Sequence, residues 1–108
     1  MMNVTSTVLG DILIARLDGR VDASSCKSLE EQAMGWIESG HTHLVFDCET
    51  MDYISSAGLR VFLLIAKRVG ERSGSVKLCG LSAPVREIFD ISGFSQLFAI
   101  VPALSDAL

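Results

Sequence analysis

Residues 43–60 read HLVFDCETMDYISSAGLR, and this stretch contains the transition that decides the fold. Its first part, His43–Cys48, is a short apolar run that is typical of a central strand covered on both faces. We expect a polar loop over 49–56 to follow it. An amphipathic helix is then predicted from about Ala57 to Arg72, so a strand and a helix meet here through a short connection.

The predicted helix has an apolar stripe at helical spacing. The residues expected to face the core are Leu59, Phe62, Leu63, Ala66 and Val69. Charged side chains, including Arg60 and Lys67, fall on the outer side. Leu64 lies on that same side, one turn after Arg60, where an exposed leucine can anchor a contact surface.

Two strands are predicted before this stretch, at Val4–Val8 and Ile12–Leu17. Gly10-Asp11 lies between them and is typical of a hairpin turn. A helix is expected next, and Gly40 would end it. The candidates for its cap are Asp22, Ser24 and Ser25. Its apolar positions recur at helical spacing and are Cys26, Leu29, Ala33, Trp36 and Ile37.

The second half of the chain continues this alternation of strands and helices. A strand is predicted at Val76–Cys79. Ser82 is expected to cap a third helix with Pro84 in its first turn, where a missing N–H costs little. A last short strand is predicted at Leu97–Val101, and Pro102 could open a final helix.

The predicted order of elements is β-β-α-β-α-β-α-β-α, which defines an α/β fold. After the N-terminal hairpin, the alternation implies crossovers and a mixed, largely parallel sheet with helices packed against it. The chain has 108 residues, of which 49% are hydrophobic. This is enough for one domain, spanning 1–108, with a real hydrophobic core.

Composition excludes several classes of protein. The net charge of −4 and the scattered basic residues argue against a nucleic-acid partner. Cys26, Cys48 and Cys79 are widely spaced without a CxxC motif, so we interpret them as buried apolar side chains in a reducing compartment. The amino terminus lacks a signal-peptide pattern, and the longest apolar run, Val61–Ala66, is too short to span a membrane. A cytoplasmic protein without a membrane segment is therefore expected.

Few residues point to catalysis or to a bound metal. A serine nucleophile needs a base, and the two histidines, His41 and His43, precede the third strand without any Gly-x-Ser-x-Gly motif in the chain. They could also be two metal ligands, although a site needs more. Three carboxylates near the end of that strand could chelate a cation, act as acid and base, or be solvated: Asp47, Glu49 and Asp52. Since no phosphate-binding glycine motif is present, we expect neither an enzyme nor a bound cofactor.

Ser55 and Ser56 lie where the first N–H groups of the predicted helix have no partner, which favours anions. The simplest role for such a serine is to cap the helix, which stabilises the helix by roughly 1 kcal/mol. One hydroxyl is enough for a cap. Ala57 and Gly58 follow, and small side chains leave the backbone open to an approaching partner. A partner would account for Gly58, because glycine in a helix costs up to ~1 kcal/mol relative to alanine. From these residues alone, a cap, a nucleophile and a phosphate acceptor stay open.

Four segments, in order along nearly the whole chain, resemble motifs of the STAS-domain family, and of the bacterial anti-sigma factor antagonists in particular. The segments are Gly19-Arg20-Val21-Asp22, Leu44-Val45-Phe46-Asp47, Met51–Arg60 and Ser82–Gly93. In the same order, these segments are similar to the family's motif after its second strand, to its central strand, to the motif before its second helix, and to its third helix with the cap. Each segment is weak alone, whereas their order and spacing are specific.

The resemblance implies a partner-switching protein that is phosphorylated on Ser56. In the family the modified serine lies two residues before a Gly-Leu pair and often follows an aspartate. Ser55 stands in that preceding position here and is the second candidate. The unmodified protein would bind an anti-sigma factor that is also a serine kinase of the histidine-kinase-like ATPase type, and the sigma factor would be released. Phosphorylation would break the complex, and a PP2C-type phosphatase would restore the serine.

The resemblance also implies a set of partner-binding residues around the two serines. These residues are Asp22, Ser55, Ser56, Ala57, Gly58, Leu59, Arg60 and Leu64. ATP and Mg²⁺ would belong to the kinase rather than to this chain. The alternative is a STAS subunit of a larger transport or lipid-trafficking assembly, in which the serines are structural caps and the surface is a permanent interface.

Overall fold

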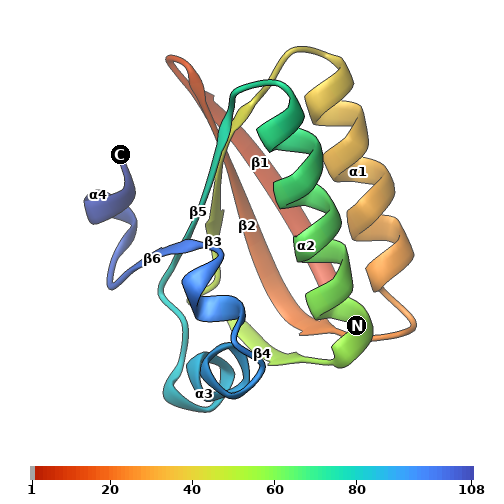
Figure 1. Ribbon diagram of the computed structural model, residues 1–108, viewed down its shortest axis with the longest axis vertical. Coiled ribbons are helices and arrows are strands. Elements are labelled where there is room, and N and C mark those ends of the chain that lie inside the picture. Colours follow the sequence, from red (N-terminus) through yellow and green to blue (C-terminus); the bar gives the residue numbers. More distant parts are fainter. Residues whose placement is uncertain (1) are drawn as a thin grey trace.

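A six-stranded sheet organises the chain, of which the computed structural model describes residues 2–108 (Figure 1). Its strands are β1 (Met2–Leu9), β2 (Ile12–Val21), β3 (His43–Asp47), β4 (Met51–Ile54), β5 (Ser75–Cys79) and β6 (Ala99–Val101). The strand order is β1-β2-β3-β5-β6, and β4 lies off this path, paired with β2. β1 and β2 are antiparallel, whereas the other pairs are parallel. The predicted mixed, largely parallel sheet is confirmed.

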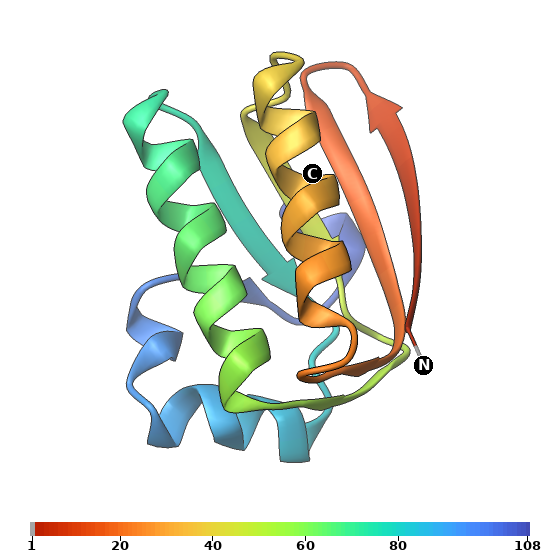
Figure 2. The ribbon, with the colours of Figure 1, turned by 90° about the vertical axis from the view of Figure 1, so that its right-hand side faces the viewer.

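The helices pack mainly on one face of this sheet (Figures 1 and 2). They are α1 (Cys26–Glu38), α2 (Ser56–Glu71), α3 (Ala83–Ile91), the short 3-10 helix η1 (Phe94–Gln96) and α4 (Leu104–Ala107). α1 and α2 lie side by side across the sheet, and α3 lies near the carboxyl ends of the strands. α4 lies on the opposite side of the sheet. In the part of the chain that the structure describes, no helix is both long and apolar enough to cross a membrane.

The N-terminal hairpin forms as predicted around Gly10-Asp11, and Gly10 has a φ of 60°, which glycine adopts readily. β2 then runs beyond the predicted end at Leu17. Gly19, with a φ of 96°, marks a shift of register that bends the strand. One strand therefore serves two parallel partners: β2 pairs with β3 before the bend and with β4 after it.

The loop predicted at 49–56 is wrong, because it contains the strand β4. β4 has four residues, of which Met51 and Ile54 are buried while Asp52 and Tyr53 are exposed. So short a segment has no readable period of two, and its pairing partner, the end of β2, is far away in sequence. The observed order is therefore β-β-α-β-β-α-β-α-β-α, with η1 before the last strand.

The core lies between the sheet and the helix layer. Phe62 of α2 is at its centre and makes edge-on contacts with Phe46 of β3, Phe89 of α3 and Phe98. The prediction that Leu63 faces this core is wrong: Leu63 is 40% exposed, and Ile65 is buried instead. Residues 61–66 are all apolar, so their spacing alone does not decide which side of the helix faces inward.

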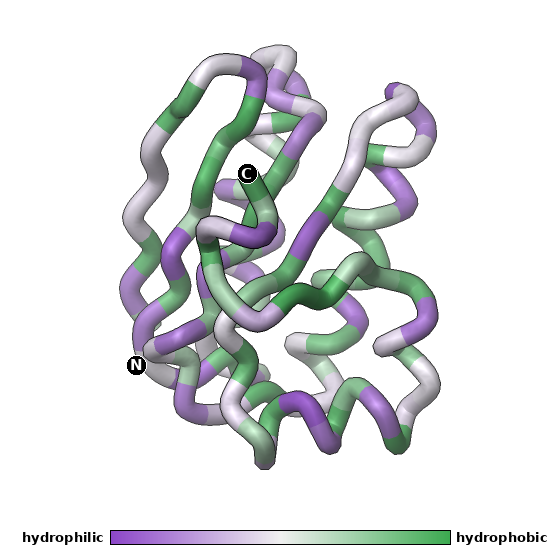
Figure 3. The backbone as a smooth tube through the Cα atoms, turned by 90° about the vertical axis from the view of Figure 1, so that its left-hand side faces the viewer, coloured by the Kyte–Doolittle hydropathy of each residue, from purple (hydrophilic) through white to green (hydrophobic). Residues whose placement is uncertain are grey.

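A smaller apolar cluster covers the other face of β3. Figure 3 shows that the C-terminal segment of the chain lies over this face. Val45 of β3, Cys79 of β5 and Ala107 of α4 are buried together there. The prediction of a central strand covered on both faces is thus confirmed, with α4 as the second cover. Burial also raises the pKa of the Cys79 thiol to about 11, which keeps it protonated and unreactive.

The C-terminal third follows the prediction closely. Ser82 caps α3 by accepting the N–H of Val85 at 3.4 Å, with Pro84 in the first turn. The last strand is shorter than predicted: β6 begins at Ala99, because Leu97 belongs to the turn that follows η1 and is exposed.

Candidate functional site

The start of α2 gives its two serines different roles. Ser55 is the N-cap: its Oγ accepts the N–H of Gly58 at 3.2 Å, and its carbonyl accepts the N–H of Leu59 at 2.9 Å. Its own N–H donates to the Val21 carbonyl at 2.9 Å, which attaches the helix start to the end of β2. Ser55 is half-buried. Both its backbone and its hydroxyl are therefore committed to the fold.

Ser56 is the first residue of α2 and is exposed. Within residues 2–108, its hydroxyl makes no hydrogen bond, and the N–H groups of Ser56 and Ala57 have no acceptor. The sequence left both serines open as caps of the helix, and the structure assigns the cap to Ser55. The hydroxyl of Ser56 is left free beside two unpaired N–H groups, an arrangement that can accommodate an anion.

The presence of glycine at position 58 has a structural reason that the sequence does not reveal. It is buried, and a β-carbon built on it would lie 2.8 Å from the Val21 carbonyl oxygen and 2.9 Å from Val21 Cγ1. A β-carbon at this position would also lie 2.8 Å from Ile54 Cγ1. The expectation that Gly58 opens the backbone to a partner is therefore corrected: the elements that approach it are β2 and β4. Leu59, 7% exposed, also faces the core, so neither residue offers a surface for contact.

The turn from β2 into α1 is held by hydrogen bonds within it. Asp22 Oδ1 accepts the Ser24 hydroxyl at 2.7 Å and the Ser24 N–H at 3.0 Å. These bonds, with a lesser contribution from Arg20, lower the pKa of Asp22. Ser25 occupies the N-cap position of α1, yet its hydroxyl donates to the Arg20 carbonyl at 2.7 Å and does not cap the helix.

This turn and the start of α2 are neighbours because they follow adjacent parallel strands. Arg20 and Val21 of β2 are in register with Tyr53 and Ile54 of β4. The Arg20 guanidinium lies over the Tyr53 ring, 4.3 Å from its centroid. Asp22 and the two serines thus leave the sheet at the same edge, the carboxyl ends of β2 and β4.

Beyond the serines, residues of α1 and α2 line an open groove of about 270 Å³, which we call the α1–α2 groove. Its lining residues are Cys26, Glu30, Ser56, Ala57, Arg60, Val61 and Leu64. A second hollow of about 260 Å³ shares Glu30 and Leu64 with it and continues toward Glu71. The lining therefore combines apolar side chains with charged ones, as protein interfaces do.

Four of the predicted partner-binding residues line this groove: Ser56, Ala57, Arg60 and Leu64. Leu64 is on the surface, as expected, with 39% exposed. Sequence reasoning missed the α1 side. Cys26 and Glu30 are four residues apart and therefore lie on the same side of α1. Glu30 directly follows the buried Leu29, so this side borders the buried face. That spacing was the signal that could have found both residues.

The two histidines considered for catalysis or metal binding lie apart from Ser56 in the part of the chain that the structure describes. His43 begins β3 and contacts Ser75 Oγ through Nδ1 at 2.9 Å, whereas Ser56 follows the opposite, carboxyl ends of the strands. Within residues 2–108, no three His, Cys, Asp or Glu side chains are grouped to hold a metal ion. Asp47, for example, is buried and accepts the N–H of Glu49 at 3.2 Å.

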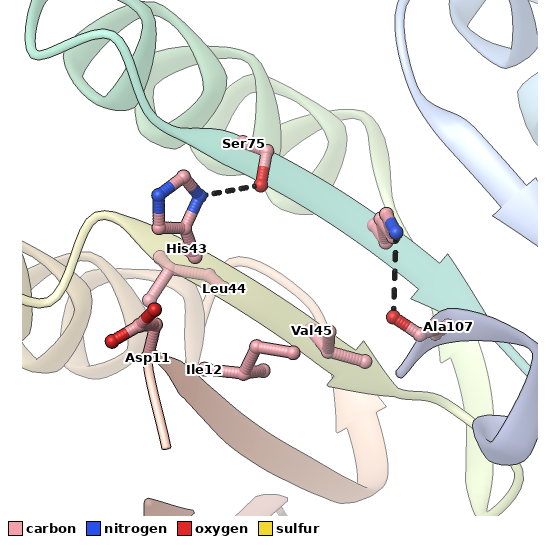
Figure 4. A pocket seen from close by; sticks show the side chains of 8 residues that line it. Asp11, Ile12, His43, Leu44, Val45, Ser75 and Ala107 are labelled. Carbon is pink, nitrogen blue, oxygen red and sulfur yellow. Dashed lines mark hydrogen bonds between the residues drawn. The ribbon is translucent and has the colours of Figure 1, made fainter. Parts of the chain in front are cut away.

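Another hollow, of about 360 Å³, lies on the opposite face of the sheet (Figure 4). Its residues are Asp11, Ile12, His43, Leu44, Val45, Ser75, Lys77 and Ala107. Lys77 Nζ donates there to the Ala107 carbonyl at 3.4 Å, which holds α4 against the sheet. None of the predicted phosphorylation or partner-binding residues lines this hollow.

Comparison with known proteins gives one consistent result. The family model for the STAS domain matches residues 3–107. BtrV of Bordetella bronchiseptica, assigned to the anti-sigma factor antagonists, is 40% identical over 99 residues, which cover 92% of this chain and 85% of BtrV.

Solved structures share the fold. A Thermotoga maritima protein assigned to the same class superposes with a TM-score of 0.93 at 14% identity, covering 96% of this chain and 90% of that protein. The Bacillus protein SpoIIAA in its phosphorylated form has a TM-score of 0.75 at 18% identity, with 99% of this chain and 96% of SpoIIAA covered.

Proposed function

The chain belongs to the STAS-domain family, and from this we propose that it is an anti-sigma factor antagonist, a cytoplasmic binding protein rather than an enzyme. With Ser56 unmodified, it binds an anti-sigma factor, which then releases its sigma factor. The anti-sigma factor is also a serine kinase of the histidine-kinase-like ATPase type. Phosphorylation of Ser56 breaks the complex, and a PP2C-type phosphatase restores the binding form.

The observation that carries this proposal is that the two serines have different structural roles. Ser55 caps α2, while the Ser56 hydroxyl is exposed and unbonded within residues 2–108. Ser56 also lies in the lining of the α1–α2 groove, next to Arg60 and Leu64. A kinase that docks on this groove would find an acceptor hydroxyl that the fold does not use.

The effect of a phosphate would differ between the free protein and the complex. Phosphoserine adds roughly −1.5 to −2 charges at pH 7. At a helix N-terminus a negative charge is stabilising by about 0.3–1 kcal/mol, and the N–H groups of Ser56 and Ala57 are available to it. In an interface that buries Ser56, the same charge without a partner costs several kcal/mol. Since ~1.4 kcal/mol is a tenfold change in affinity, modification releases the partner and leaves the fold intact.

The test is to incubate the full chain with histidine-kinase-like serine kinases, ATP and Mg²⁺, and to map phosphate by mass spectrometry. Wild type and Ser55→Ala are expected to be modified on Ser56, whereas Ser56→Ala is not modified. Ser55→Ala is the matched control, since it removes the neighbouring hydroxyl only. Phosphate on Ser55, or none when a control substrate of the same kinase is modified, would overturn the proposal.

Binding separates this function from that of a permanent subunit. The unmodified chain is expected to bind the kinase, and Ser56→Asp to bind it weakly. If wild type, Ser56→Ala and Ser56→Asp all bind with equal affinity, the charge at residue 56 does not control binding and the proposed switch is overturned. A protein that instead co-purifies with a membrane transport complex would support the subunit alternative.

A further inference from the structure

β1 is an open edge of the sheet. It pairs with β2 along its whole length, from Met2 opposite Gly19 to Leu9 opposite Ile12, and the strand order ends with it. In Figure 2 it forms the outer border of the molecule, with α1 inward of it and no part of residues 2–108 beyond. Alternate residues of an antiparallel edge strand direct their N–H and C=O groups away from their one neighbour. β1 therefore presents a row of such groups outward.

This edge lacks the features that normally prevent pairing with another chain. Proteins protect edges with charged side chains, proline, bulges or very short strands. β1 has eight residues, MNVTSTVL, with no charge, no proline and an unbroken register. It is also rich in β-branched residues, which favour strand pairing. At the opposite end of the strand order, β6 has three residues and is followed by Pro102, and β4, which pairs only with β2, has four residues. Within residues 2–108, β1 is therefore the one long edge strand without such protection.

We propose that β1 pairs in antiparallel fashion with β1 of a second copy of this chain, giving a two-fold symmetric dimer with one continuous sheet. An antiparallel pair of identical strands is self-complementary, as a two-fold axis requires. The strand is uncharged, so the two copies meet without like-charge repulsion. This inference is independent of the proposed function, since no residue of β1 lines the α1–α2 groove.

The exposed apolar side chains at the end of β1 favour one register for the proposed pairing of the two β1 strands. Val8 and Leu9 are 53% and 55% exposed, although they lie at the end of a regular strand. A two-fold axis at Ser6 places Val8 opposite Val4 of the second copy, and Thr7 opposite Thr5. Met2 and Val4 pack on the helix-side core, so by alternation Val4, Ser6 and Val8 share that face. The dimer would thus cover Val8 with a β-branched neighbour, an arrangement that stabilises strand pairs.

The first test measures the mass of the full chain in solution by sedimentation equilibrium. Wild type is expected to form a reversible dimer. Ser6→Lys places two like charges opposite each other at the axis and should weaken dimerisation by about tenfold or more. Ser28→Lys adds the same charge on the exposed side of α1 and should dimerise like wild type. Circular dichroism of both variants checks that the fold is kept.

Cross-linking tests the register itself. Residues directly opposite in a hydrogen-bonded antiparallel pair have Cα atoms about 5.5 Å apart, which a disulfide can bridge. Ser6→Cys is expected to give an intermolecular disulfide under mild oxidation, and Thr7→Cys, which faces Thr5, to give much less. A wild-type chain that stays monomeric at its highest soluble concentration would overturn the proposal. A Ser6→Lys variant as dimeric as wild type would do so too, because the dimer would then use another face.

Discussion

A β-carbon added to Gly58 would lie 2.8 Å from the carbonyl oxygen of Val21, so the first turn of α2 and the end of β2 are in direct backbone contact. The N–H of Ser55 donates to the same carbonyl at 2.9 Å. Together these contacts determine where the helix begins relative to the sheet, and hence where the side chains of its first turn emerge.

Gly58→Ala should therefore destabilise the fold. Alanine is favoured over glycine in a helix by up to ~1 kcal/mol, but here the new methyl group meets backbone, and such overpacking costs about 1–3 kcal/mol. Chemical denaturation measures the change. Gly35→Ala, in α1 with nothing within 4 Å, is the matched control and should stabilise slightly. A Gly58→Ala protein as stable as wild type would contradict the close contact.

The two serines should differ in their effect on stability. Ser55→Ala removes the hydroxyl that accepts the Gly58 N–H and should lower the free energy of unfolding by about 1 kcal/mol. Ser56→Ala removes an unbonded, exposed hydroxyl and should change it little. Thermal and urea unfolding of the two variants measure this difference. The reverse order would mean that Ser56 is the cap.

Ser56→Asp should separate binding from folding. A carboxylate at the first position of α2 should leave the unfolding free energy unchanged or raise it by a few tenths of a kcal/mol. Affinity for the anti-sigma factor, measured by calorimetry, should fall by about tenfold or more if the side chain is buried in the complex. Ser28→Asp, on the exposed side of α1, controls for net charge and should bind normally. Loss of binding by both variants would point to a nonspecific effect of charge.

Leu63 and Leu64 form a matched pair for testing the groove. They are 40% and 39% exposed, but only Leu64 lines the α1–α2 groove. Leu64→Ala should weaken binding of the anti-sigma factor by about 1 kcal/mol or more, the range of an interface anchor, while Leu63→Ala should not. Surface plasmon resonance on the two variants gives the comparison. If both or neither lose affinity, the partner does not use the groove in this way.

Stability should also depend on Asp22 at acid pH. Its hydrogen bonds from Ser24, with a smaller contribution from Arg20, lower its pKa in the folded state. A lowered pKa means that the carboxylate stabilises the fold above its unfolded pKa of about 4, and that this contribution is lost as the pH falls below that value. The difference in unfolding midpoint between wild type and Asp22→Asn should therefore shrink between pH 7 and pH 3. An equal difference at both values would show that Asp22 does not contribute through its charge.

Features that depend on neighbours in sequence were predictable. The hairpin at Gly10-Asp11 and the cap of α3 by Ser82 follow from residue types at fixed spacing. β4 was not predictable, because four residues form a strand only by pairing with β2, whose paired residues lie more than thirty positions earlier in the chain. The role of Gly58 was missed for the same reason, since Val21 is its determining neighbour.

The candidate site shows the same limit. Family resemblance and helical spacing led to Ser56, Arg60 and Leu64, which lie together in the α1–α2 groove. The sequence did not decide which of the two serines caps α2, because helix ends depend on backbone geometry that residue types only suggest. Glu30 was missed, because its place beside Leu64 depends on how two helices pack.

The adjacent serines have a consequence for protein engineering. Since position 55 maintains the helix and position 56 does not, residue 56 can be exchanged without rebuilding the scaffold. With Ser56 kept as the proposed phosphate acceptor, a library varied at residues 60 and 64 would sample partner recognition on a constant backbone. Such a library is a practical starting point for orthogonal switch components, each of which answers its own kinase and ignores the others.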